Sequence, residues 1–367
     1  MRKHLTFFKM YFYVLPPVLI LLLIIQIYMT LPPKHIVIEA GPKGGFFSET
    51  AYFLKSRLKK YGITAKIINV PDTTNIVHRV NKLDNASDLG FIAQDLGSQK
   101  FKNISSLGSI ILEPLLIFVK RNSKIVKISD LQGKKVAIGP VNSGVRKLGE
   151  EILSNYNVNK NNTKFLPISI LKSAAMIKSN EIDAALFLLP IETKVIAELS
   201  KNVTLKVLHF DQSVAITKHY PFLTDVVIPH GGFSIKDNLP QRDIFLIAMP
   251  VSLIIKNNSN TSLQLIIAHL LKDRFREETL ITAKNTLPKN YLKYIKMEKH
   301  VLNYYKDGVP LFLQKLPEEL SMAILGSLPQ LTIFILIYII LAGLLTFVRY
   351  YQTYLAFKTV LLEDHQR

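Results

Sequence analysis

Residues 135–146 read Lys-Val-Ala-Ile-Gly-Pro-Val-Asn-Ser-Gly-Val-Arg, and this stretch decides the fold class. Residues 135–138 contain a short apolar run with β-branched side chains, which indicates a buried strand. Residues 139–144 are rich in Gly, Pro, Asn and Ser, which is typical of a loop. A helix is predicted from 145 to about 153. The order of strand, glycine loop and helix is the repeating unit of an α/β fold.

A second unit of the same kind lies nearer the N-terminus. Residues 36–40 predict a strand, residues 41–45 (Gly-Pro-Lys-Gly-Gly) a tight loop, and apolar residues at helical spacing continue to Gly62. Further strand and helix patterns follow each unit. In both halves an Asp, Asp88 or Asp183, precedes a buried strand. We therefore predict two similar α/β lobes rather than a true sequence repeat.

The chain is predicted to cross between the two lobes twice. Residues 112–120 look extended and would cross between the lobes, and the chain would cross back near residues 205–215. The resulting boundaries are 33–117 with 216–300 for lobe 1, 118–215 for lobe 2 and 301–328 for a linker.

Two apolar segments flank these lobes. Residues 12–31 are nearly all apolar, and a bilayer core needs about 20 such residues as a helix. Arg2, Lys3 and Lys9 precede them, which favours a cytoplasmic N-terminus. A cleaved signal peptide is the alternative, although no small-residue cleavage site follows the run. Residues 1–32 are therefore predicted to be a cytoplasmic tail and a first transmembrane helix.

The second apolar segment, residues 331–348, is followed by Arg349. A buried core helix is the alternative, but the uncharged run favours a membrane span. We predict a second transmembrane helix at 329–349 and a cytoplasmic tail at 350–367. The main domain would then face the periplasm or cell exterior of a prokaryotic cytoplasmic (inner) membrane.

Composition excludes several classes of protein. The formal net charge is +19, which could attract anionic solutes or lipid headgroups, or could be a generic Lys-rich surface. The lysines are scattered, so nucleic-acid binding is not indicated. The chain has no cysteine, which excludes disulfides and a lipoprotein anchor. No P-loop, dinucleotide, metalloprotease or nucleophile-elbow motif occurs, so the sequence predicts no cofactor, no metal and no catalytic residue.

The two glycine loops are the main candidate for a binding site. A helix N-terminus exposes unpaired N–H groups and a partial positive charge, so it can hold a carboxylate or phosphate. Glycine lets the backbone approach such a ligand closely. Each loop alone is an ordinary turn in the simpler interpretation, but matching loops in both lobes favour a shared ligand. The candidates from this argument are Gly44, Gly45, Phe46, Phe47, Asn142, Ser143, Gly144 and Arg146.

An ordered set of motifs resembles the TAXI group of TRAP-transporter solute receptors. Residues 41–47 resemble the family's G-x-x-G-x-Y-Y, and residues 139–146 resemble its G-x-x-x-S-G-T-R. The resemblance runs in order from about residue 36 to 271. It also includes residues 88–95, Glu113-Pro114-Leu115, residues 130–136, Ile182-Asp183-Ala184, Tyr220-Pro221 and residues 228–231.

This resemblance implies a two-lobed type II periplasmic-binding-protein fold that closes on an organic acid or amino acid. Gly45, Phe46, Phe47, Gln94, Ser143, Gly144, Val145 and Pro190 are the cleft residues that it implies by position. Asn75 and Gly231, from the aligned stretches 74–78 and 228–231, complete the candidate set. Phe replaces Tyr at 46 and 47 and Val replaces Thr at 145, so the implied site has fewer polar groups than is usual for the family.

The resulting hypothesis is a membrane-anchored receptor that delivers a small anionic or zwitterionic solute to TRAP-type permease subunits. A ligand sensor or scaffold without transport is one alternative, and an enzyme on the same fold is a less favoured one. A co-purified permease would favour transport, and a kinase partner would favour sensing.

Overall fold

The computed structural model describes residues 17–364, except positions 19, 23, 27, 29, 71, 72, 85, 86, 98–100 and 293. Much of the predicted first membrane segment therefore lies outside the described residues. The chain forms two units. The larger consists of residues 34–259 and 267–308 and contains both predicted lobes, and the smaller consists of residues up to 33, 260–266 and 309 onward.

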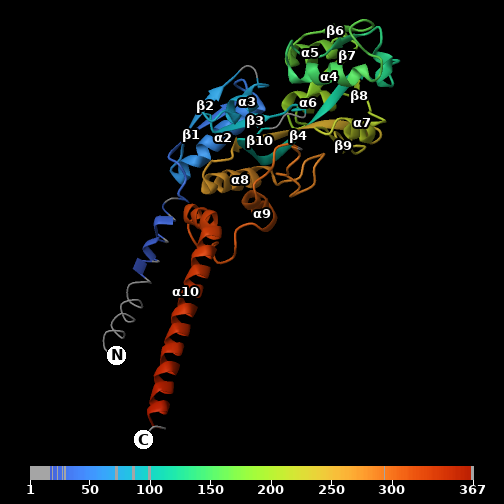
Figure 1. Cartoon of the computed structure of the whole chain (residues 1–367). Helices are drawn as coiled ribbons and strands as arrows, with labels where there is room; N and C mark the ends of the chain where they lie inside the picture. The colour runs from blue at the N-terminus through green and yellow to red at the C-terminus, as the bar shows by residue number, and fades with distance from the viewer. Residues whose placement is uncertain are drawn as a thin grey trace. The chain divides into compact units, whose positions relative to one another are not determined.

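Lobe 1 is built on a sheet whose first three strands are parallel (Figure 1). Helix α2 packs on β1 and β2, and α3 packs on β3 and β10. Helix α9 (Lys299–Asp307) also belongs to the larger unit, and α8 (Thr261–Phe275) begins in the smaller unit and continues into the larger. The strands in spatial order are β2 (Thr64–Asn69), β1 (His35–Ala40), β3 (Leu89–Ile92), β10 (Ile244–Lys256) and β4 (Ile104–Lys120). The helices that pack on them are α2 (Phe46–Leu58) and α3 (Ile76–Asn81).

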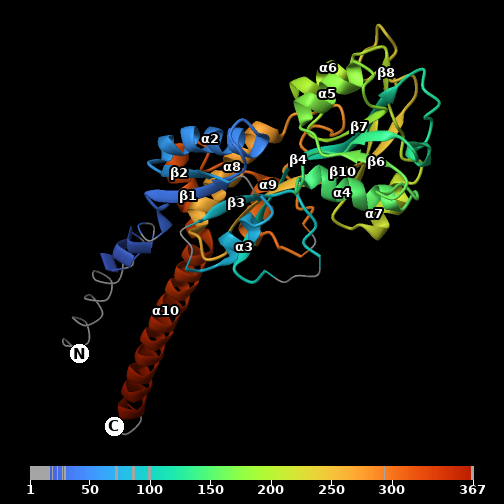
Figure 2. The same ribbon diagram turned by 90° about the horizontal axis from the view of Figure 1, so that it is seen from above.

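Lobe 2 repeats this plan (Figure 2). Strands β5, β6 and β7 are parallel, and β4 runs antiparallel to β7 and β8. Helices α4 and α5 pack on β7, and α6 packs on β8. The strands in spatial order are β6 (Lys164–Leu166), β5 (Lys135–Ala137), β7 (Ala184–Leu188), β4 and β8 (Leu205–Val207). The helices of this lobe are α4 (Gly144–Ser154), α5 (Ile170–Lys178) and α6 (Lys194–Ser200).

The two lobes share one order: second strand, first strand, third strand, then a long crossing strand. Asp88 and Asp183 have the same role in this plan. The Asp88 carboxylate accepts a hydrogen bond from the Val37 N–H at 2.8 Å, and the Asp183 carboxylate accepts one from the Lys135 N–H at 2.8 Å. Each aspartate thus ties the start of the third strand of its lobe to the first strand. The predicted two-lobed α/β fold is confirmed.

Strands β4 and β10 are the two connections between the lobes. They pair antiparallel from Ala248 opposite Pro114 to Lys256 opposite Ile104. Beyond Pro114, β4 pairs with β7 and β8 of lobe 2 instead. Almost every residue of both strands is buried, as expected for Ile-, Leu- and Val-rich strands covered on both faces.

The return crossing lies in β10, which corrects the sequence-based placement near residues 205–215. Residues 216–243, which had been assigned to lobe 1, belong to lobe 2. Strand β9 (Thr224–Ile228) pairs with β10 at residues 244–248, and helix α7 (Ser213–His219) packs on both. The physical reason is apolar burial, because Ile216, Leu223, Val226 and Ile228 all join the lobe 2 core.

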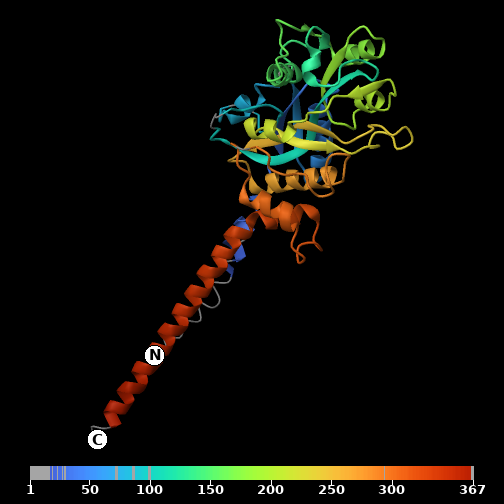
Figure 3. The same cartoon turned by 90° about the vertical axis from the view of Figure 1, so that its right-hand side faces the viewer.

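The smaller unit is dominated by the long helix α10 (Glu318–Asp364) (Figure 3). Its first turns are packed: Met322 and Ala323 are buried, and a Cβ on Gly326 would meet the Ser262 side chain at 2.6 Å. Within the described part of the chain, one helical stretch, Ile335–Leu355, is long and apolar enough to cross a bilayer, with a mean hydropathy of 1.6 and none of it buried.

Candidate functional site

Each predicted glycine loop joins the first strand of a lobe to a helix. Residues 41–45 lead from β1 into α2, and residues 138–143 lead from β5 into α4. Ligands of open α/β sheets bind outside the carboxyl ends of the strands, where these loops lie. Gly139 has φ of 90°, and a Cβ there would meet the Val145 side chain at 2.4 Å. The turn into α4 thus requires glycine at this position.

The lobe 1 loop is followed by two half-buried phenylalanines. Phe47 stacks on Phe91 of β3, with ring centroids 5.1 Å apart, and Phe46 packs against Phe275, with centroids 6.1 Å apart. These contacts fix both rings to lobe 1. Gly44 has φ of 78° and Gly45 is the N-cap of α2, so both have a clear role in the turn.

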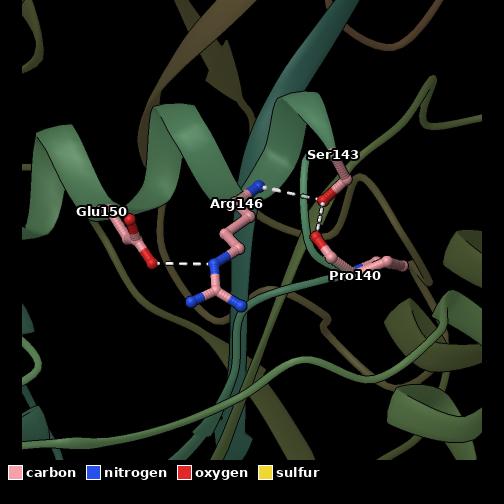
Figure 4. Close-up of polar contacts among 4 residues, drawn as sticks. All are labelled: Pro140, Ser143, Arg146 and Glu150. Atoms are coloured by element: carbon pink, nitrogen blue, oxygen red, sulfur yellow. Dashed lines mark hydrogen bonds and ion pairs between the residues drawn. The ribbon is translucent and has the colours of Figure 1, made fainter. Parts of the chain in front are cut away.

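The polar side chains at the lobe 2 loop make their hydrogen bonds within the loop and helix α4 (Figure 4). Ser143 caps α4: its hydroxyl accepts a hydrogen bond from the Arg146 N–H at 3.4 Å and donates one to the Pro140 carbonyl at 2.7 Å. Arg146 Nε donates to Glu150 Oε1 at 2.8 Å. The backbone amides at the start of α4 and the two Nη atoms of Arg146 are the groups left for an anion.

The remaining loop residues around α4 support the turn and the packing of the helix. Asn142 has a positive φ of 63°, so it supports the turn through its backbone conformation. Gly144 begins α4 with open space where a Cβ would be, and Val145 packs against the lobe 2 core.

The other predicted residues fall into two groups. Asn75 is the N-cap of α3, Gln94 donates a hydrogen bond to the Thr74 carbonyl at 2.9 Å, and Pro190 follows β7. All three therefore lie after the carboxyl end of a strand or at the start of a helix. Gly231, with φ of 70°, is different. It lies in the β9–β10 loop, before the first residue of β10, whereas the hinge-cavity residues Met249 and Pro250 lie in the middle of that strand.

A cavity of about 380 Å³ occupies the junction of the lobes, and we call it the hinge cavity. Its walls come from both lobes, from the crossing strand β10 and from the segment after α8. Of the predicted residues, Gln94 alone is in its lining. The lining consists of Gln94, Asp95, Leu96, Gly97, Glu151, His219, Tyr220, Pro221, Phe222, Met249, Pro250, Tyr291, Leu292 and Tyr294.

The hinge cavity is acidic and phenolic. Asp95 of lobe 1 and Glu151 of lobe 2 both line it, whereas none of its lining residues is Lys or Arg. Burial, and secondly the charge of Asp95, raise the pKa of Glu151 above its ordinary value. Burial also raises the pKa of Tyr291, with a smaller contribution from Asp225. Carboxylates and phenol rings suit a ligand with an ammonium group.

Sequence reasoning missed most of this lining. Tyr220 had been noted only as part of a family motif, and Tyr291 and Tyr294 had been assigned to lobe 1 without a role in the site. Glu151 lies eight residues after Ser143, which is about 12 Å along a helix axis. Across the described residues, no group of three or more His, Cys, Asp or Glu side chains is arranged to hold a metal ion.

A two-lobed α/β body with two crossing strands and a cavity at the junction has the architecture of the type II periplasmic-binding-protein class. A family model described as the NMT1-like family matches residues 94–286. This match covers more than half of the 367 residues, and the chain belongs to the NMT1-like family.

The solved structures to which the chain is similar have low sequence identity to it. An ancestral arginine-binding protein bound to arginine is 14% identical, with a TM-score of 0.38 over 68% of this chain and 95% of that one. The putative sulfonate-binding protein of a Methylobacillus flagellatus KT ABC transporter is 13% identical, with a TM-score of 0.41 over 66% and 69%. The Synechocystis PCC6803 CcmR regulatory domain in complex with 2-PG is 12% identical, with a TM-score of 0.40 over 66% and 98%. At these scores, the likenesses assign no ligand to the chain.

Proposed function

We propose that the chain is a membrane-anchored extracytoplasmic receptor that binds a small zwitterionic solute between its lobes and delivers it to a TRAP-type permease. The observation that carries this proposal is the hinge cavity, because it lies where two crossing strands join two similar α/β lobes. Solute enclosed there contacts both lobes at once, so it shifts the balance of open and closed forms toward the closed one.

The chemistry of the site favours a solute with two opposite charges. The amide groups at the starts of α2 and α4 suit a carboxylate, but they lie outside the lining of the hinge cavity, and Ser143 is about 12 Å along the helix axis from Glu151. Asp95, Glu151 and the phenol rings of the hinge cavity suit an ammonium group. An amino acid or a related zwitterion carries both groups, whereas a simple dicarboxylate would bring a second negative charge toward Asp95 and Glu151.

Two features support the membrane anchor. None of the described side chains in the apolar stretch Ile335–Leu355 of α10 is buried, and such exposure is costly in water and favourable in a bilayer. The loop before α10 also exposes apolar side chains: Leu311 is 81% exposed and Phe312 is 66% exposed. Both belong to the smaller unit, so a single lipid surface would cover them.

The TRAP-type assignment rests on the motifs that resemble TAXI receptors. Several of these motifs have structural roles that suit a ligand receptor. The stretch 139–146 forms the turn and N-terminus of α4, and Glu113-Pro114 lies in β4 at the level where the lobes diverge. A tethered receptor meets its permease at a raised effective concentration without additional contacts. Export to the outer face of a prokaryotic inner membrane is part of the same proposal.

The test compares amino acids with matched acids that lack the amino group, such as glutamate with glutarate. Full-length protein in detergent is titrated by calorimetry, after native mass spectrometry has identified any retained solute. We expect at least one amino acid to bind at least tenfold more tightly than its partner acid. Binding of the partner acids alone would contradict a zwitterionic ligand, and no saturable binding from either set would contradict the receptor function.

A further inference from the structure

A second cavity, of about 190 Å³, lies in lobe 2, and we call it the lobe 2 pocket. It is enclosed by the end of β4, by β8, by the end of α6 and by the β9–β10 loop (residues 229–243). It shares no lining residue with the hinge cavity. It is therefore a separate candidate site, and the proposed receptor function does not use it.

The charged side chains of the lobe 2 pocket have one sign. Arg121, Lys206 and Arg242 line it, and none of its lining residues is Asp or Glu. Arg121 is held in place, because its Nε donates to the Val203 carbonyl and its Nη2 to the Leu205 carbonyl, both at 2.8 Å. Within the described residues, neither Lys206 nor Arg242 makes a side-chain hydrogen bond or ion pair. Two of three converging cations are thus available to a ligand.

Neighbouring groups act on the charge of Lys206 in both directions. Burial lowers the pKa of Lys206, and the charges of Arg121 and Arg242 lower it further, while Asp130 acts in the opposite direction. The Asp130 carboxylate is engaged by the backbone N–H groups of Val126 and Lys127, at 2.9 and 3.0 Å.

His209 also lines the lobe 2 pocket, but it adds no positive charge in this arrangement. Its Nδ1 accepts a hydrogen bond from the Phe245 N–H at 3.0 Å, so the ring proton is on Nε2, which faces Asp211 at 3.0 Å. The cationic character of the pocket therefore comes from lysine and arginine alone.

An independent observation comes from Ser200. Its side chain lines the lobe 2 pocket, the residue is only 7% exposed, and its hydroxyl has no hydrogen-bond partner among the described residues. Buried hydroxyls in folded proteins are nearly always hydrogen-bonded. After a small shift of the side chains that cover this hydroxyl, a ligand oxygen in the pocket would supply the missing partner. The other walls are largely apolar, with Phe118, Leu208 and Phe233 among them.

We propose that the lobe 2 pocket binds a small organic oxyanion, a carboxylate or sulfonate with a compact apolar body. The oxyanion lies against Lys206, Arg242 and the Ser200 hydroxyl, and the apolar body lies against the aromatic and aliphatic wall. An occupant would connect β8 to the β9–β10 loop, and β10 runs from that loop to the hinge cavity. The pocket is thus a second ligand site on the receptor.

The experiment uses benzoate as the organic probe, sulfate as the inorganic probe and chloride as the control at matched ionic strength. Full-length protein in detergent is studied by thermal shift and calorimetry. We expect saturable binding of benzoate, weakened at least tenfold by Lys206→Gln. Arg242→Gln gives a second reading at an exposed position, should Lys206→Gln fail to fold. Lys164→Gln, an exposed charge on β6, is the matched control and should bind as the parent does.

Ser200→Ala separates a ligand contact from a structural role. Removing an unpartnered buried hydroxyl should leave the melting temperature of the free protein unchanged or raise it, while the benzoate-dependent shift falls. The proposal is overturned if benzoate has no saturable effect on the parent protein. It is also overturned if Lys206→Gln and Arg242→Gln bind benzoate as tightly as the parent does. Equal affinity for sulfate and benzoate overturns the organic part of it. Glu151→Gln in the hinge cavity should leave benzoate binding intact, so this test and that of the receptor function can fail separately.

Discussion

Glu113 of β4 lies directly opposite Met249 of β10 in the antiparallel register. Side chains of residues paired in this way lie on the same face of a sheet. Met249 lines the hinge cavity, and Glu113 is only 8% exposed. Burial raises the pKa of the Glu113 carboxyl to about 8. The strand that joins the lobes therefore contains a carboxylic acid that keeps its proton near neutral pH.

Glu113→Gln should change how stability depends on pH. The folded-state pKa of Glu113 lies above its ordinary value of 4.5, so its contribution to stability is fully present below pH 4.5 and is lost as pH rises through about 8. Glutamine has a similar shape and cannot ionise. We expect the variant to match the parent near pH 4.5 and to exceed it at pH 9 by on the order of 5 kcal/mol.

Thermal unfolding of the full-length protein between pH 4.5 and 9 checks this prediction. Glu192→Gln removes an exposed carboxylate of lobe 2 and is the matched control, with a pH profile expected to follow that of the parent. Parallel profiles for the parent and Glu113→Gln would show that the Glu113 carboxyl ionises equally in the folded and unfolded states.

Gly139→Ala tests the turn into α4. The positive φ of 90° strains any other residue, and the added Cβ would meet Val145 at 2.4 Å. We expect a loss of about 1–3 kcal/mol in unfolding free energy. Gly133→Ala is the matched control, since its φ is 74° but nothing lies within 4 Å of the new Cβ. It should lose only the strain contribution, and an equal loss in both variants would exclude the steric part.

Short-range patterns predicted the two strand–loop–helix units well. The predicted helix at 145–153 is α4 at Gly144–Ser154, and the predicted strand at 135–138 is β5 at Lys135–Ala137. These elements depend on local apolar spacing and turn residues, which a single sequence contains. The paired roles of Asp88 and Asp183 were visible for the same reason, as matching positions before two buried strands.

Long-range pairing explains what could not be predicted. The 13-residue strand β10 connects the lobes only because it pairs with β4, more than 130 residues earlier in the chain. The local sequence of α7 and β9 does not say which lobe they join. Tyr220, Tyr291 and Glu151 come from three distant segments, and their meeting in the hinge cavity is a consequence of tertiary structure. Predicted residues in the glycine loops are largely engaged in forming the turns themselves.

Glu151→Gln should weaken binding of a zwitterionic solute about tenfold, equivalent to about 1.4 kcal/mol. The reason is loss of a partly buried negative charge beside the ammonium group. Glu150→Gln is the matched control on the same helix, because Glu150 pairs with Arg146 and does not line the cavity. Calorimetric titration of both variants gives the comparison, and equal affinities would remove Glu151 from the site.

The affinity should also depend on pH. Because burial and Asp95 raise the pKa of Glu151, this carboxyl takes up a proton at a higher pH than an ordinary glutamate does. As the pH is lowered, the affinity for an ammonium-bearing solute should therefore begin to fall before exposed carboxylates become protonated. The decline should be absent in Glu151→Gln, and an unchanged decline in that variant would assign it to another group.

The proposed membrane orientation can be tested with single cysteines, because the chain has none of its own. Val126→Cys lies on an exposed surface of lobe 2, Leu341→Cys within the apolar stretch of α10, and Lys358→Cys near its far end. A membrane-impermeant maleimide applied to spheroplasts should label Val126→Cys, because the lobes would face outward. It should not label Leu341→Cys, since lipid would surround that position. Lys358→Cys should react only after the membrane is permeabilised, whereas labelling of all three in intact spheroplasts would exclude a spanning α10.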